Sequence, residues 1–193
     1  MTERTEYVHK AASDEEYMRL EQMLDDRHEL VNGMLFLTAG GTVRHNRIAG
    51  MLYAKLLEAM GDGECEAFIE NVKLRFANST FYYPDVMVVC DSSDHDPRYR
   101  TRPCFVAEVL SGCTAPIDRG EKLLNYRTIP SLQTYVLLAQ NTVRAEVYSK
   151  LPDGAWRYEV LENDALLEIP CAGLKLPVSS LYKGVLSGSS GML

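Results

Sequence analysis

Two nearly continuous apolar runs constrain the fold of this chain more than any other feature. They are FYYPDVMVVC at 81–90 and CFVAEVLS at 104–111, and Asn, Asp, Pro or Gly residues bound both. Strands with one solvated face alternate apolar and polar residues, whereas strands covered on both faces are apolar throughout. We therefore expect two central strands of a sheet that has helices on both faces.

Three segments have the apolar spacing of helices. The first, 13–24, opens with a capping box formed by Ser13 and Glu16. The second, 43–60, repeats apolar residues three and four apart and stops at a Gly-Asp-Gly sequence. The third, 117–128, begins after one proline and ends before another.

The remaining segments read as strands and turns. An Asn32-Gly33 pair between two short apolar runs predicts a hairpin after the first helix. Further strand-rich segments occupy 64–77, 132–139, 142–149 and 156–162. Together with the helices, this order predicts a mixed α/β fold, with an N-terminal helix and hairpin and a mixed central sheet.

Length and charge restrict the class of protein further. A chain of 193 residues suits one domain over 1–186, and the sequence SGSSGML at 187–193 reads as a flexible Gly/Ser tail. The net charge of −7 argues against nucleic-acid binding through bulk positive charge. No apolar run approaches the roughly 20 residues of a membrane-spanning helix, and the N-terminus is polar and acidic, so we expect a soluble cytoplasmic protein that does not bind membranes.

The cysteines indicate neither a disulfide framework nor a zinc knuckle. They number five, lie far apart, and form no C-x-x-C pair: Cys65, Cys90, Cys104, Cys113 and Cys171. We expect reduced thiols, mostly in the core.

Polar residues inside the two apolar runs are the candidates for chemistry. A carboxylate in an apolar strand is costly unless a partner offsets its charge, and both Asp85 and Glu108 are in that position. If the two strands are neighbours, the acids repel each other, and a divalent metal would relieve the repulsion. On the next helix, Asp118, Lys122 and Tyr126 share one face. Two acids and a lysine are suited to metal-assisted phosphodiester hydrolysis.

Each of these residues also has an ordinary structural interpretation. Asp85 and Glu108 could be strand-end caps, and Lys122 could be a solvated surface lysine. Arg98, Arg100 and Arg102 form a basic run between the two strands that carry the acids. This run is either a solvated loop or a set of phosphate contacts beside the site.

The motifs PDVMVV, AEVLSGCT, the Asp-x-x-x-Lys-x-x-x-Tyr pattern at 118–126 and QTYVLL together resemble one family. This is the Uma-two-type restriction endonuclease family, a branch of the PD-(D/E)XK nuclease superfamily. The resemblance extends upstream to HELVNGMLF and to the His-led start of the second helix, and it covers about 13–186. It implies a restriction-endonuclease-like fold and a Mg²⁺-dependent endodeoxyribonuclease, with Mn²⁺ as an alternative ion.

The family also implies roles for particular residues. Asp85 and Glu108 would bind the metal, and Lys122 would replace the lysine that most superfamily members have two residues after the glutamate, where this chain has Leu110. The supporting residues implied by the matching motifs are Glu29, His45, Asp118 and Tyr126.

Two other functions remain open. One is a non-enzymatic interaction or nucleic-acid-binding module of the same fold, which the negative net charge favours. The other is a metal-dependent hydrolase of a small phosphodiester. DNA is the expected substrate of the nuclease, and a homodimer would let two sites cut two strands.

Overall fold

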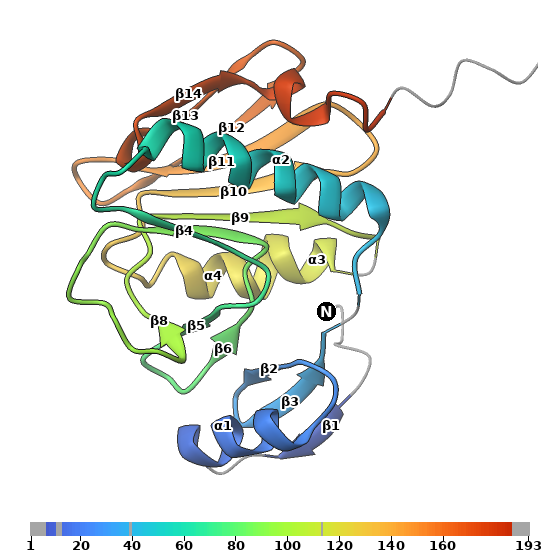
Figure 1. Ribbon diagram of the computed structural model, residues 1–193, viewed down its shortest axis with the longest axis vertical. Helices are drawn as coiled ribbons and strands as arrows, with labels where there is room; N and C mark the ends of the chain where they lie inside the picture. Colours follow the sequence, from blue (N-terminus) through green and yellow to red (C-terminus); the bar gives the residue numbers. More distant parts are fainter. Residues whose placement is uncertain (1–6, 11–12, 39, 113, 187–193) are drawn as a thin grey trace, which may run out of the picture.

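The computed structural model describes residues 7–10, 13–38, 40–112 and 114–186. The tail expected at 187–193 lies outside the described residues. Within the described residues the strands form two six-stranded sheets and a two-stranded hairpin. The sheet with the longer strands, called the larger sheet below, has helices on both faces (Figure 1).

The elements follow one another in the order expected for a mixed α/β chain. The helical segments are α1 (Asp14–Met23), α2 (Val43–Met60), α3 (Ala115–Ile117), the π-helical turn η1 (Asp118–Lys122), α4 (Leu123–Tyr126), and the 3₁₀ turns η2 (Pro170–Ala172) and η3 (Val178–Tyr182). The strands of the larger sheet are β4 (Glu66–Ile69), β7 (Val86–Val89), β9 (Phe105–Leu110), β10 (Thr134–Ala139), β11 (Arg144–Lys150) and β12 (Trp156–Glu162). Those of the second sheet are β1 (Tyr7–Lys10), β2 (His28–Val31), β3 (Met34–Leu37), β5 (Lys73–Arg75), β6 (Phe81–Tyr82) and β8 (Tyr99–Arg100), while β13 (Leu166–Ile169) pairs with β14 (Leu174–Pro177).

The larger sheet has the strand order β12-β11-β10-β9-β7-β4. Strands β9 and β10 are parallel, and the other neighbours are antiparallel. The parallel pair needs a crossover connection, which the helical segment from α3 to α4 provides. Helix α2 lies across one face of this sheet and α3–α4 lie against the other (Figure 1).

Strand β9 shows how both faces are filled. Ala107 and Val109 pack in the core under α2, whereas Val106 and Leu110 pack with Tyr126 of α4. Successive side chains of a strand point to opposite faces. Glu108 therefore points to the face that α3–α4 cover, which confirms the expectation of a central strand covered on both sides.

The second sheet contains the N-terminal hairpin. Asn32 and Gly33 have φ values of 51° and 77°, as a two-residue turn of the primed type requires. Ser13 caps α1 by accepting a hydrogen bond from the backbone N–H of Glu16. The expected first helix and hairpin are thus confirmed.

The run 81–90 differs from its expectation of one continuous strand. It forms β6 in one sheet and β7 in the other, and the chain changes sheet at Tyr83, Pro84 and Asp85. Proline has no N–H to donate to a ladder, so a strand that reaches Pro84 ends there. Asp85 consequently lies immediately before β7 rather than inside a strand.

The cysteine expectation was wrong for four of the five residues. Cys65 is bonded to Cys90 and Cys104 to Cys171. The wide spacing of these cysteines does not indicate the pairs, because the segments that carry them meet only in the folded protein. Cys113 lies outside the described residues.

Among the described residues, no helix is long and apolar enough to cross a membrane.

Candidate active site

Asp85 and Glu108 lie side by side at the junction of the two sheets. Strands β7 and β9 pair with Val86 opposite Ala107, so the next position brings Asp85 opposite Glu108. The backbone N–H of Asp85 donates to Glu108 Oε2 at 3.4 Å, and the N–H of Val109 donates to Asp85 Oδ2 at 2.6 Å. The two strands are therefore neighbours, and their pairing brings the two acids together.

Lys122 faces these acids from the helix. Its Nζ lies 3.0 Å from Glu108 Oε1, 3.1 Å from Glu29 Oε1 and 3.5 Å from Asp118 Oδ1. The residue is 6% exposed, so the alternative of a solvated surface lysine is excluded. Leu124, two positions later, takes the solvent-facing side of the helix at 66% exposure.

A π-helical turn forms this part of the helix. It runs from Asp118 to Lys122, and both residues are buried on the side of the sheet. Such wide turns inside α-helices occur frequently at functional sites. Here the helix presents two charged side chains, and Tyr126 beyond them, to the same carboxylate-rich space.

Tyr126 and Tyr82 complete the surroundings of the lysine. The Tyr126 hydroxyl donates to Glu108 Oε1 at 2.7 Å, and the ring of Tyr82 lies 5.4 Å from Lys122 Nζ. Tyr82 is itself held by hydrogen bonds with Glu121 and Asn125. The ammonium group of Lys122 therefore contacts the ring of Tyr82 as well as the carboxylates.

His45 approaches Asp85 from the start of α2. Its Nε2 lies 3.1 Å from Asp85 Oδ1, and Thr42 caps the helix by accepting from the His45 N–H. Burial alone would lower the pKa of His45, but the hydrogen bond and charge of Asp85 outweigh it and raise that pKa.

One cavity of about 320 Å³ connects these groups. Its lining includes Glu29, His45, Asp85, Glu108, Asp118 and Lys122. Cavities of this size are typical of small-ligand sites.

The electrostatics of the cavity are dominated by acids in a poorly solvated space. Burial raises the pKa of Glu108 to about 8; Lys122 opposes this shift, while Asp85 adds to it. Burial also raises the pKa of Asp118, again against the effect of Lys122. For Lys122 itself, burial favours loss of charge, but the carboxylates of Glu108, Glu29 and Asp118 outweigh it and hold its pKa well above the ordinary value.

The donor set fits a hard divalent cation. Mg²⁺ is held in proteins by one or two carboxylates and retains several waters. Asp85 and Glu108 supply such a pair, and two further acids, Glu29 and Asp118, line the same cavity. Within the described chain, buried Asp118 Oδ1 accepts no hydrogen bond and is paired with Lys122 Nζ at 3.5 Å, so this oxygen retains capacity to accept a further contact.

The basic run lies apart from this cavity. Arg98 pairs with Asp96, Arg100 with Glu66 and Arg102 with Asp91, and none of the three lines the cavity. Arg98 and Arg102 are exposed at the surface, whereas the Arg100 side chain is mostly buried. These contacts favour the loop interpretation over phosphate contacts beside the site, and the expected solvation holds for Arg98 and Arg102 but not for Arg100.

Sequence reasoning missed two charged residues that line the cavity, Arg27 and Glu70. Arg27 donates to the carbonyl oxygen of Glu70 and to Asn71 Oδ1, which ties the start of the hairpin to the end of β4. Glu70 has a φ of 54°, a conformation that few non-glycine residues adopt. The sequence carries no signal of that conformation.

Comparisons with known proteins give matches over most of the chain. A family model described as "Uma2: Putative restriction endonuclease" matches residues 14–179. Two proteins of Synechocystis sp. are similar: "Uncharacterized protein slr1290" is 33% identical over 90% of this chain and 92% of its own length. "Uncharacterized protein sll1609" is 35% identical over 79% of this chain and 89% of its own length.

A solved structure shares the fold. It is the crystal structure of "a putative nuclease belonging to DUF820" from Anabaena variabilis, with a TM-score of 0.72 and 18% sequence identity. The alignment covers 90% of this chain and 99% of that one. The restriction-endonuclease-like mixed α/β fold expected from the sequence is therefore confirmed.

Proposed function

Because the chain belongs to the Uma2 family of restriction-endonuclease-like proteins, we propose that it is a divalent-metal-dependent endonuclease that hydrolyses DNA phosphodiester bonds. The observation that carries this proposal is that Asp85, Glu108 and Lys122 line one cavity although they come from two strands and a helix. A pair of acids with a lysine beside them is suited to metal-assisted phosphodiester hydrolysis.

In this proposal Asp85 and Glu108 hold Mg²⁺ or Mn²⁺. The bound ion would polarise the phosphate and lower the pKa of a water molecule. The hydrogen bond from Val109 N–H orients Asp85, and the hydroxyl of Tyr126 orients Glu108. These contacts hold the acids in place before substrate arrives, so little reorganisation accompanies the reaction.

Lys122 has the role of offsetting negative charge on the phosphate. Glu29 and Asp118 flank its ammonium group, and burial keeps water away from it. A charge held in a poorly solvated place acts more strongly on a nearby anion than one in water.

A non-enzymatic binding module is the second candidate. It is favoured by the net charge of −7 and by the pairing of Arg98, Arg100 and Arg102 with acids of their own neighbourhood. A hydrolase of small phosphodiesters is the third, since the cavity of about 320 Å³ accommodates one small ligand.

Nicking of supercoiled plasmid DNA, run beside hydrolysis of a small model phosphodiester, separates the three. The nuclease relaxes the plasmid in Mg²⁺ or Mn²⁺ and stops when a chelator removes the ion. The small-substrate hydrolase acts on the model compound alone, and the binding module acts on neither.

Two variants make the result specific to the site. Asp85→Asn removes one metal-binding carboxylate with little change in shape, so we expect nicking to fall to background. Glu168→Gln is the matched control, because Glu168 is exposed on β13 and pairs with Lys175 outside the cavity. Nicking by Asp85→Asn at the parent rate would refute the proposed site, since a contaminating nuclease would then explain the activity.

A further inference from the structure

Four cysteines from four separate segments converge where strands β4, β7 and β9 of the larger sheet begin or end. Cys65 precedes β4, Cys90 follows β7, Cys104 precedes β9, and Cys171 lies in η2 between β13 and β14. Strands β4 and β7 pair with Glu66 opposite Val89, so the next register position brings Cys65 opposite Cys90. Pairing of β7 with β9, and packing of the β13–β14 hairpin, adds the other two.

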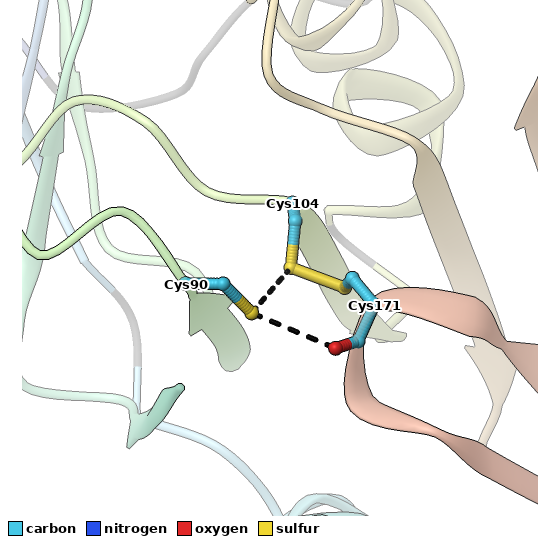
Figure 2. A group of neighbouring side chains, drawn as sticks. All are labelled: Cys90, Cys104 and Cys171. Carbon is cyan, nitrogen blue, oxygen red and sulfur yellow. Dashed lines mark hydrogen bonds between the residues drawn. A yellow bond between two sulfur atoms is a disulfide. The ribbon is translucent and has the colours of Figure 1, made fainter. Parts of the chain in front are cut away.

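Three of the four sulfurs form one compact group, and the fourth, Cys65 Sγ, is bonded to one of the three. The structure bonds Cys65 to Cys90 and Cys104 to Cys171. The two disulfides touch each other, because Cys90 Sγ lies 3.6 Å from Cys104 Sγ and 3.6 Å from the carbonyl oxygen of Cys171 (Figure 2). The sulfurs of Cys90, Cys104 and Cys171 all lie within 4.8 Å of one another.

The spacing of Cys90, Cys104 and Cys171 is close to that of three ligands in a tetrahedral thiolate site. In a four-thiolate zinc site each sulfur is about 2.3 Å from the ion, which places the sulfurs roughly 3.8 Å apart. The Cys90–Cys104 separation already has this value within a few tenths of an ångström. Loss of the two S–S bonds lets the bonded sulfurs move apart to the same non-bonded distance.

We propose that the reduced chain binds one zinc ion through Cys65, Cys90, Cys104 and Cys171, and that the two disulfides are the oxidised form of this site. Each disulfide takes two electrons and two protons from a dithiol reductant, which becomes a disulfide itself. The four thiols then release four protons as they bind Zn²⁺, and the complex has a charge of −2.

The sulfur cluster is accessible enough for a reductant and a zinc ion to reach it. Cys65, Cys90 and Cys171 are partly exposed, and only Cys104 among the four is fully buried. The cluster is also separate from the acidic cavity. The four residues of strand β7 lie between Asp85 and Cys90, and the five steps along the chain span about 17 Å at about 3.4 Å per residue. None of the four cysteines lines that cavity.

Metal titration of the reduced protein tests the proposal. The chain is reduced with a non-chelating phosphine, freed of metal without oxygen, and titrated with Co²⁺ and then with Zn²⁺. We expect one Co²⁺ per chain with the intense visible absorption of tetrahedral cobalt–thiolate coordination. One equivalent of Zn²⁺ should abolish that absorption, and native mass spectrometry should find one zinc per chain.

Three variants assign the ligands. The double variant Cys90→Ser/Cys171→Ser should lose the absorption and the bound zinc. Cys113→Ser removes the remaining cysteine and should bind zinc as the parent does. Asp85→Asn removes a cavity acid and should keep the full cobalt–thiolate absorption. Loss of that absorption in Asp85→Asn would overturn the proposal, because the ion would then belong to the acidic cavity.

Two measurements on the parent protein test the proposal even if a variant fails to fold. Bound zinc should slow alkylation of Cys65, Cys90, Cys104 and Cys171, as peptide mass spectrometry measures, and should raise the melting temperature of the reduced protein. If the reduced parent protein binds no zinc, or alkylates these four residues equally fast with and without it, the proposal is wrong.

Discussion

Lys122 contacts three buried carboxylates, and this arrangement determines how the site responds to substitution. Removing one member of a buried ion pair leaves its partner uncompensated and costs about 3–5 kcal/mol. Loss of Lys122 would leave Glu29, Glu108 and Asp118 facing one another. Loss of one carboxylate still leaves the ammonium with two others. The lysine and the acids are therefore not equivalent positions.

Replacing Lys122 by Met is expected to lower the nicking rate per folded molecule by roughly ten- to a thousandfold, or about 1.4–4 kcal/mol of transition-state stabilisation. Affinity for Mn²⁺ should not fall, because the change removes a positive charge from beside the metal-binding acids. Plasmid nicking and calorimetric Mn²⁺ titration measure the two effects, and circular dichroism gives the folded fraction. A parent-like rate per folded molecule would give Lys122 a role in folding alone.

Replacing Glu108 by Gln is expected to stabilise the metal-free fold while abolishing activity. Burial raises the pKa of Glu108 from an ordinary 4.5 to about 8, so the folded state holds this proton more tightly than the unfolded state. The parent protein therefore loses stability as pH rises from about 4.5 to about 8, and the variant lacks that loss. We expect a gain of several kcal/mol in the free energy of unfolding at pH 8 and little gain at pH 4.5.

Urea unfolding in the presence of a chelator, at both pH values, measures this difference. Asp85→Asn, measured in parallel, shows whether the effect belongs to Glu108. A Glu108→Gln protein less stable than the parent at pH 8 would mean that the ionised carboxylate is a net stabilising partner of Lys122.

At the scale of elements, apolar spacing predicted α2 and β9 well because burial determines both patterns. Ile48, Leu52 and Leu56 recur on one helical face and pack in the core. Residues whose neighbours come from distant segments could not be placed in this way. Glu29 entered the site only through family resemblance, since nothing local shows that β2 lies over the lysine. Strand β8 and the β13–β14 hairpin are short or solvated on one side, so their patterns are weak.

Two identical substitutions at different glycines should have opposite effects on stability. Gly33→Ala places a side chain at a φ of 77° in the hairpin and should cost about 1 kcal/mol. Gly120→Ala lies in the helical turn η1, where an added Cβ meets no atom within 4 Å, and should stabilise by about 0.5–1 kcal/mol. Thermal unfolding of both variants measures the signs. Destabilisation by Gly120→Ala would show that the π-helical turn itself depends on glycine.

At the scale of the whole molecule, the negative net charge predicts weak electrostatic attraction to DNA. Each phosphate neutralised by a protein cation contributes about 0.9 to the slope of log affinity against log salt. The cationic Lys and Arg side chains that line the cavity in the described part of the chain are Arg27 and Lys122. We therefore expect a slope of roughly −2 for the inactive Asp85→Asn protein on a labelled duplex.

Fluorescence anisotropy between about 50 and 200 mM salt gives this slope. A charge-neutral change outside the cavity, Glu168→Gln with Lys175→Gln, should leave it unchanged. A slope of about −6 or steeper would instead indicate an extended basic surface that binds six or more phosphates.

The ends of β7 and β9 have a consequence for strand register. A slip of one residue between paired strands turns every side chain to the opposite face, which would move Glu108 under α2 and away from Lys122. Cys90 and Cys104 lie at the far ends of these same strands and are covalently tied to Cys65 and Cys171. These bonds tie β7 to β4 and β9 to the β13–β14 hairpin, so a strand that slips has to carry its bonded neighbour with it. The disulfides thus add to the cost of a slip between β7 and β9, and they favour the register that keeps the two carboxylates opposite each other.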